Sequence, residues 1–195
     1  MEENCDLHWP ENVLYWDKIS EKTAELVLKQ TELVLIQTIE TAKSIQDKAD
    51  KLTALLIPSI SATTIYVLSG LDKLMDIFHI TAMLFVIVLI VSQGIIFFNL
   101  RAYSIRIPGS HPETLINNHF INREDTEKEQ YIQLALQLCK ENKLRTEKNN
   151  KLNARRSGRN QSALKILALG LILSPVIGFI LHYIFSHHSL PAPCR

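Results

Sequence analysis

The chain has 195 residues, of which 47% are hydrophobic, and its 21 Lys and Arg nearly balance its 20 Asp and Glu. A net charge of +1 gives no reason to expect binding through a broad basic face, so nucleic acid is not an expected partner. The three cysteines stand far apart, without the CxxC or CxxH spacing of metal sites, so neither a disulfide framework nor a zinc centre is predicted.

Residues 1–51 form an acidic segment for which one amphipathic helix is predicted. The segment carries six Lys against eleven Asp and Glu, and its start lacks the basic and apolar regions of a cleavable secretory signal. From about Asp17 to Lys51 there is no Gly or Pro, and apolar or small residues recur at spacings of three and four. We therefore expect a helix that continues into the next segment without a break.

Two charge-free apolar stretches follow and predict a transmembrane hairpin over residues 52–100. Residues 52–71 and 77–100 are each long enough to cross a hydrocarbon core of roughly 30 Å at about 1.5 Å per residue. The second stretch is the more apolar, because the first contains Pro58 and several hydroxyls. Only residues 72–76 separate them, so both outer ends are expected on one face of the membrane.

Residues 101–165 predict a linker and a basic helix. Thirteen Lys and Arg stand against seven acids in this segment. Ser110 opens a capping-box pattern in the linker, which predicts a short helix there, and Thr126 with Glu129 has the same spacing before a longer one. We expect the longer helix to run to the next apolar stretch, with Gly158 as the point where it bends.

A third transmembrane helix is predicted over residues 166–186, followed by a short tail at 187–195. Basic side chains crowd the end of the 101–165 segment, whereas the tail carries only Arg195. The positive-inside rule therefore places this segment and the N-terminus in the cytoplasm, and the C-terminus outside. The expected fold is all-α, an integral membrane protein with three transmembrane helices and a cytoplasmic helical module.

Small and polar residues inside the predicted spans suggest contacts between helices. Gly170, Ser174 and Gly178 form a helix-packing stripe that lets another helix approach closely. Two interpretations stay open, packing against the chain's own hairpin and self-association into a homo-oligomer. The hairpin also carries polar residues, namely Ser61, Thr64, Ser92, Gln93 and Asn99. An amide such as that of Gln93 is costly in lipid, so we expect an interhelical hydrogen bond or a pore lining.

Five residues in the helix that leads into the third span are candidate ligand-binding groups. Guanidinium groups pair bidentately with phosphates, and amides supply the donors and acceptors that read base edges. The candidates are Arg155, Arg156 and Arg159 for a phosphate and Asn149 and Asn153 for a base. In the alternative interpretation the arginines set the topology and contact anionic lipid.

No catalytic residue is predicted, so we expect that the protein is not an enzyme. The acids of the two cytoplasmic helices follow helix-surface spacing, no Ser, Cys or His stands in a nucleophile motif, and no glycine-rich phosphate loop occurs. No metal site and no bound cofactor are expected either, because no established motif is formed by His182, His187, His188 and Cys194.

Four stretches of the sequence carry a resemblance to a known family. They are QDKADKLTALLIP at 46–58, RAYSIRIPG at 101–109, LINNHFINREDTEKEQYIQLA at 115–135 and KLNARRSGRNQSALKILALGLIL at 151–173. Their order is an N-terminal helix ending in a D-K-A-like stretch, a tight hairpin, a Pro-containing linker, a Tyr-containing helix and a final span. This order resembles that of the membrane-spanning effectors of the Pycsar anti-phage systems.

The resemblance implies a protein of the bacterial inner membrane whose C-terminus lies in the periplasm. A companion nucleotide cyclase would make a cyclic pyrimidine mononucleotide, cyclic CMP or cyclic UMP, on infection. This ligand would activate the protein to impair the integrity of the membrane and cause abortive infection. Two other interpretations stay open: a membrane-anchored immunity or regulatory protein that binds a partner, and a holin-like pore former.

Overall fold

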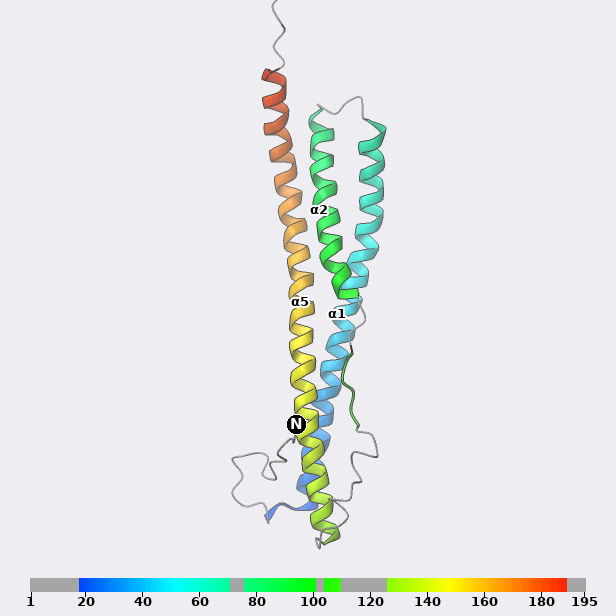
Figure 1. Cartoon of the computed structure of the whole chain (residues 1–195), viewed down its shortest axis with the longest axis vertical. Helices are drawn as coiled ribbons and strands as arrows, with labels where there is room; N and C mark the ends of the chain where they lie inside the picture. The colour runs from blue at the N-terminus through cyan, green and yellow to red at the C-terminus, as the bar shows by residue number, and fades with distance from the viewer. Residues whose placement is uncertain (1–17, 71–75, 101–103, 110–125, 189–195) are drawn as a thin grey trace, which may run out of the picture. The chain divides into compact units, whose positions relative to one another are not determined.

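The computed structural model describes residues 18–70, 76–100, 104–109 and 126–188, and the regular structure in them is α-helical. Figure 1 labels the helices α1 (Glu21–Ser69), α2 (Ile77–Leu100) and α5 (Glu127–His188). The predicted all-α fold is therefore confirmed for the part of the chain that the structure describes.

Contacts divide the chain into two compact units. The polar unit comprises Met1–Lys43 and Ser104–Asn153, and the apolar unit comprises Ser44–Tyr103 and Ala154–Arg195. Each unit thus combines early and late parts of the sequence, and both α1 and α5 contribute to both units. This grouping differs from the predicted boundaries at residues 51 and 165, which followed the edges of the apolar stretches.

Both long helices begin at hydroxyl caps. Ser20 Oγ accepts a hydrogen bond from the Thr23 backbone N–H at 3.2 Å, so α1 begins at Glu21. Thr126 Oγ1 accepts from the Glu129 N–H at 3.4 Å and the Glu129 carboxylate accepts from the Thr126 N–H at 2.9 Å, which confirms the predicted capping box. These bonds hold the pKa of the Glu129 carboxyl below its usual range, so the cap persists at neutral pH and weakens as the pH falls into the acidic range.

The two long helices are continuous over 49 residues in α1 and 62 residues in α5. α1 contains Pro58 and α5 contains Pro175, and each ring removes one backbone hydrogen bond without ending its helix. α5 also remains helical through Gly158, the residue at which the sequence predicted a bend. The predicted continuation of the N-terminal helix into the first apolar stretch is confirmed.

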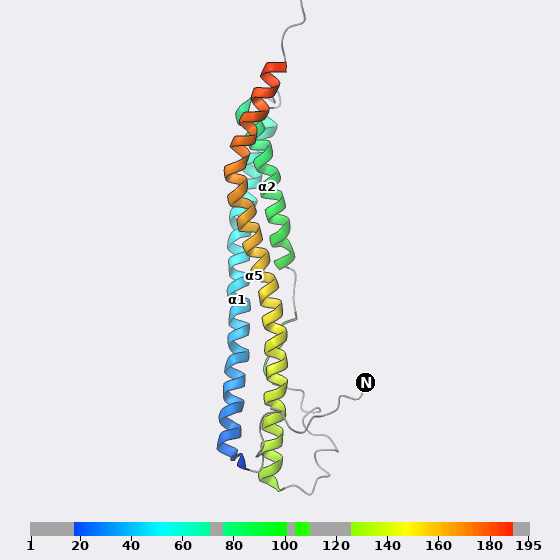
Figure 2. The same ribbon diagram turned by 90° about the vertical axis from the view of Figure 1, so that its left-hand side faces the viewer.

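In the polar unit α1 and α5 lie side by side and run in the same direction (Figure 1 and Figure 2). Along each helix the buried residues are separated by three, four or seven residues, or by sums of these, as in the heptads of a coiled coil. The buried residues are Ala24, Leu35, Thr38 and Ala42 in α1 and Ala135, Cys139, Asn142, Asn149 and Asn153 in α5. Because many of these side chains are small or polar, hydrogen bonds add to apolar burial in joining the helices.

The apolar unit has a core to which all three helices contribute. Its buried cluster consists of Ala49, Leu56, Leu89, Ile96 and Ala163. In the described residues, α1, α2 and α5 are each long and apolar enough to span a membrane. The bounds of α2 coincide with the predicted span at 77–100.

Large apolar side chains cover the outside of the apolar unit. Phe78, Phe97 and Ile172 are 70%, 67% and 66% exposed, whereas Ser92 and Asn99 are buried. This distribution is the reverse of that in a protein that folds in water, where large apolar side chains gather inside. It is the distribution expected of helices that face lipid and turn their polar groups inward. The predicted cap at Ser110 and the tail from residue 189 lie outside the described residues.

Candidate functional site

Two asparagines of α5 bind α1 in the polar unit. Asn153 Nδ2 donates to the Thr38 carbonyl at 2.8 Å, and Asn149 Nδ2 donates to Thr38 Oγ1 at 3.0 Å. A carbonyl inside a helix has a second lone pair, so Asn153 adds a bond without disturbing α1. Both asparagine side chains are buried. Asn149 and Asn153, the predicted contacts to a base, therefore join the two helices.

Asn149 also holds an extended segment, residues 104–109, which we call the linker strap. Its Oδ1 accepts a hydrogen bond from the Arg106 backbone N–H at 3.0 Å, and its Nδ2 donates to the Arg106 carbonyl at 2.9 Å. The side-chain amide thus pairs with both backbone groups of one residue, as a neighbouring strand would. This pairing fixes the path of the strap along α5.

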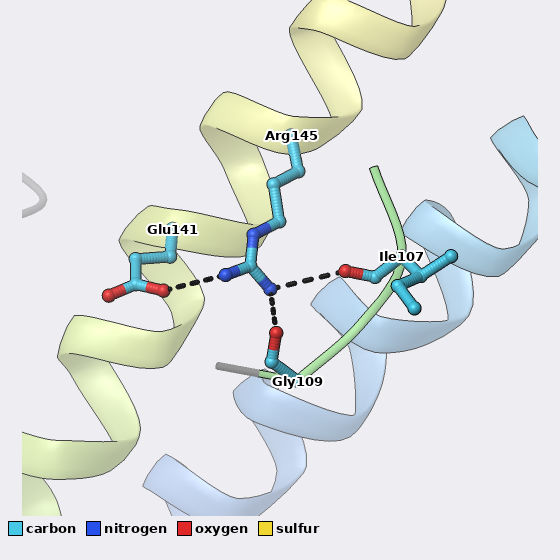
Figure 3. Close-up of polar contacts among 4 residues, drawn as sticks. All are labelled: Ile107, Gly109, Glu141 and Arg145. Atoms are coloured by element: carbon cyan, nitrogen blue, oxygen red, sulfur yellow. Dashed lines mark hydrogen bonds and ion pairs between the residues drawn. The ribbon is translucent and has the colours of Figure 1, made fainter. Parts of the chain in front are cut away.

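Arg145 clamps the end of the linker strap, as Figure 3 shows. Its Nη1 donates to the carbonyls of Ile107, at 3.2 Å, and Gly109, while its Nη2 forms an ion pair with Glu141 at 3.0 Å. Gly109 has a φ of 92°, a conformation that residues with a Cβ atom disfavour. Its carbonyl is turned toward the arginine. One arginine therefore fixes two successive points of the strap.

Replacing Arg145 by Ala is expected to release the linker strap. The loss of two charge-assisted hydrogen bonds costs about 1.5 kcal/mol or more, which raises the population of the released strap roughly tenfold. Trypsin cleavage between Arg106 and Ile107, followed by mass spectrometry, measures this population. Glu141→Gln keeps an acceptor beside Arg145 and is expected to change cleavage less than about threefold. Equal cleavage of Arg145→Ala and the unchanged protein would contradict the clamp.

A second hydrogen-bonded group joins all three helices in the apolar unit. This polar cluster comprises the side chains of Gln46, Asn99, Arg156 and Asn160 and the carbonyl of Ile45. Asn160 Nδ2 donates to the Ile45 carbonyl of α1 at 3.2 Å, and its Oδ1 accepts from Asn99 Nδ2 of α2 at 2.6 Å. Asn99 Nδ2 also donates to the Arg156 carbonyl at 2.8 Å. α1, α2 and α5 are therefore tied together at one level.

Two arginines of α5 cap the C-terminus of α2. Arg156 Nη2 donates to the Asn99 carbonyl at 3.3 Å and to Gln46 Oε1, and Arg159 Nη1 donates to the Phe98 carbonyl at 3.3 Å. The last four carbonyls of a helix have no partner inside it, and its C-terminus carries a partial negative charge. The guanidinium groups meet both needs, so they hold the end of α2 against α5.

The five predicted ligand-binding residues divide between the units and differ in their surroundings. Asn149 and Asn153 belong to the polar unit, and the three arginines belong to the apolar unit. Arg156 is 3% exposed and bonds to α1 and α2, whereas Arg155 is exposed and Arg159 is partly exposed. Arg155 and Arg159 are therefore the members of the set that solvent, lipid headgroups or a soluble anion can reach.

The small-residue stripe of α5 packs against α2 of the same chain. A Cβ atom added to Gly170 would overlap the Val88 side chain, and one added to Gly178 would overlap the Thr81 hydroxyl. Ser174 between them is 3% exposed. Of the two interpretations of the stripe, the contacts within the chain favour packing against the chain's own hairpin. The stripe leaves no free surface for a second copy in this arrangement.

Thr38, Gln46 and Arg145 did not emerge from the sequence as functional residues. A signal for the interhelical asparagines was present in their spacing. Asn153 and Asn160 are seven residues apart, and they donate to the carbonyls of Thr38 and Ile45, which are also seven residues apart. A constant heptad offset between two helices predicts parallel packing. Arg145 had no such signal, because its partners are backbone carbonyls of a distant segment.

The described residues suggest a packing and capping role for these groups more than a reactive one. No group of three or more His, Cys, Asp or Glu in the described ranges is placed to hold a metal ion. Cys139 is buried, and burial raises the pKa of its thiol, so the reactive thiolate is disfavoured. Comparisons with protein-family models, with curated proteins and with solved structures give no match.

Proposed function

We propose that the protein is a membrane effector in which a cytoplasmic signal alters the packing of the spans and impairs the membrane. The observation that carries this proposal is the continuity of α1 and α5, which run from the polar unit into the candidate spans. A continuous helix passes a rotation or a shift along its length, because its backbone hydrogen bonds resist local bending. A change in the polar unit is then felt in the apolar unit without a separate hinge domain.

The proposed location is the bacterial inner membrane, with the N-terminus in the cytoplasm and the C-terminus in the periplasm. The charge contrast across the third span supports this orientation, because the 101–165 segment is rich in Lys and Arg and the tail carries only Arg195. The lipid bilayer is then the partner of the outward apolar side chains. Self-association of copies in the bilayer is part of the proposal, through a surface other than the filled glycine stripe.

The proposed signal is a cyclic pyrimidine mononucleotide made by a companion cyclase during phage infection. The resemblance to Pycsar effectors supports this identity, and the exposed guanidinium of Arg155 supplies a group that pairs with a phosphate. Moving a two-state equilibrium from 1:99 to 99:1 needs about 5.5 kcal/mol of differential binding. A phosphate held by several charge-assisted hydrogen bonds supplies energy of this order, at about 1.5–3 kcal/mol each.

The test uses the full chain in liposomes exposed separately to cyclic CMP, cyclic UMP and cyclic AMP. We expect a cyclic pyrimidine nucleotide to bind and to release a trapped dye, and cyclic AMP to do neither. Arg155→Glu is expected to weaken binding at least tenfold, because it places a negative charge where the phosphate approaches. Lys151→Glu makes the same reversal of charge at an exposed position four residues earlier in α5, and it is the matched control.

The outcomes separate the competing functions. If no cyclic nucleotide binds, the effector proposal fails and a partner-binding immunity or regulatory protein takes its place. Leakage that depends on protein density alone, without any nucleotide, favours the holin-like pore former. If Arg155→Glu and Lys151→Glu weaken binding equally, the nucleotide responds to net charge and its site lies elsewhere.

A further inference from the structure

α2 buries polar as well as apolar side chains. The buried residues are His79, Ile80, Leu89, Ser92, Ile96 and Asn99. Half of them are polar, although α2 has the highest mean hydropathy among the candidate spans. Ser92 and Asn99 are both 0% exposed, and their separation of seven residues puts them on one face, about 10 Å apart along the axis.

Several oxygens near this face have no hydrogen-bond partner in the described part of the chain. They are Ser92 Oγ, Gln93 Oε1 and Asn99 Oδ1 of α2 and Thr53 Oγ1 of α1. A buried polar atom without a partner is destabilising, and hydrocarbon supplies no substitute. Gln93 Oε1 therefore does not form the interhelical hydrogen bond that the sequence predicts for Gln93. Water is the partner that suits hydroxyl and amide oxygens at such a position.

Thr53 and Ser92 each stand between residues of the same core cluster. In α1, Thr53 stands between two core residues, Ala49 and Leu56, and in α2, Ser92 stands between two members of the same core cluster, Leu89 and Ile96. α1 and α2 run in opposite directions (Figure 1), and the four flanking residues belong to one buried cluster. The unpaired oxygens therefore come from two helices and share one part of the interior.

An apolar block separates these oxygens from a second polar group nearer the start of α2. Phe85 packs against the core, and Leu89 is 2% exposed. Beyond them His79 is buried, and neither of its ring nitrogens has a hydrogen-bond partner in the described residues. Asp76 Oδ2 lies 4.0 Å from its Nδ1, and the Tyr66 ring stacks on it with centroids 4.8 Å apart. Polar groups thus lie on both sides of an apolar constriction.

We propose that the buried face of α2 lines a path for water and small inorganic ions, which Phe85 and Leu89 close in this structure. An apolar constriction stops ions because they cannot shed their hydration shell there. The hydroxyl and amide oxygens on one side of it, and the polar groups of His79 and Asp76 on the other, replace part of that shell. The inference rests on the proposed function in taking the apolar unit to lie in a bilayer. It deepens that function by naming an ion path, and not general disruption of lipid, as the route of damage.

Leu89→Asn tests the constriction with the full chain in liposomes and without any nucleotide. A polar side chain at the closure is expected to raise potassium efflux at least tenfold over the unchanged protein, while a trapped dye much larger than an ion stays inside. Ile90→Asn is the matched control, because Ile90 is the next residue but is 53% exposed on the outer side. Its efflux is expected to equal that of the unchanged protein.

Efflux of Leu89→Asn at the unchanged rate overturns the path, and so does equal leakage from Ile90→Asn or rapid release of the dye. Ser92→Cys gives a second measurement that does not depend on whether Leu89→Asn folds, since it changes one atom. A small charged thiol reagent is expected to modify Ser92→Cys at least tenfold faster than Val91→Cys, whose side chain is 46% exposed on the outside. Mass spectrometry of the labelled peptide reads the rates, and equal or slower labelling of Ser92→Cys rejects the path. Neither measurement uses a nucleotide, so a failure of ligand binding leaves this inference standing.

Discussion

Replacing Arg156 by Met is expected to lower the midpoint of thermal unfolding by roughly 10 °C. The side chain is 3% exposed and donates to Gln46 Oε1 of α1 and to the Asn99 carbonyl of α2. Met keeps most of the apolar stem but leaves the buried Asn99 carbonyl and the partly buried Gln46 Oε1 without this donor. Leaving a buried acceptor without its donor costs about 1–3 kcal/mol for each group. Circular dichroism of the protein in detergent measures the midpoint.

Arg155→Met is the matched control for this change, because it removes the same group from the preceding residue, which is exposed. A substitution at an exposed position away from such contacts changes stability by about 0.5 kcal/mol or less. The pair also separates two roles of the arginines. If Arg156→Met unfolds at the same temperature as Arg155→Met, the polar cluster does not hold the helices together and Arg156 returns to the set of candidate ligand-binding residues.

Gly170→Ala is expected to destabilise the apolar unit by about 1–3 kcal/mol, the usual cost of inserting a methyl group into a packed interior. The added Cβ would overlap the Val88 side chain of α2, so α5 must move away from α2 or Val88 must change its rotamer. Thermal unfolding in detergent again measures the loss. A second change, Val88→Ala, makes room for the methyl group, and the double variant is expected to recover part of the stability.

Gly94→Ala provides the control for Gly170→Ala. A Cβ added at Gly94 would meet open space beyond the backbone of its own helix, and Ala has the higher helix propensity. This variant is therefore expected to be neutral or more stable by up to about 1 kcal/mol. Chemical crosslinking of copies in membranes distinguishes the two interpretations of the stripe. If Gly170→Ala keeps its stability but loses crosslinked oligomers, the stripe contacts a second copy and its packing against Val88 is secondary.

Much of the secondary structure follows from short-range patterns in the sequence. The apolar stretch at 77–100 coincides with α2. Charged residues stand directly before and after this long charge-free run, so they mark both of its ends. The Thr126 and Glu129 pair marks the start of α5 because a capping box depends on residues only three positions apart. The spacing of Gly170, Ser174 and Gly178 predicts a packing surface for the same reason, since residues four apart share a helix face.

The tertiary structure alone decided which partners these groups take. Arg155 and Arg156 are neighbours with the same chemistry, yet a rotation of about 100° per residue leaves one exposed and buries the other against the end of α2. Asn149 and Asn153 looked like groups that could read a base, but α1 and the linker strap occupy their donors. The stripe's partner is α2 because Val88 and Thr81 lie opposite the glycines. The sequence determines which faces are apolar, small or polar, whereas the identity of the facing residue depends on how separate helices are brought together, and no local pattern records that.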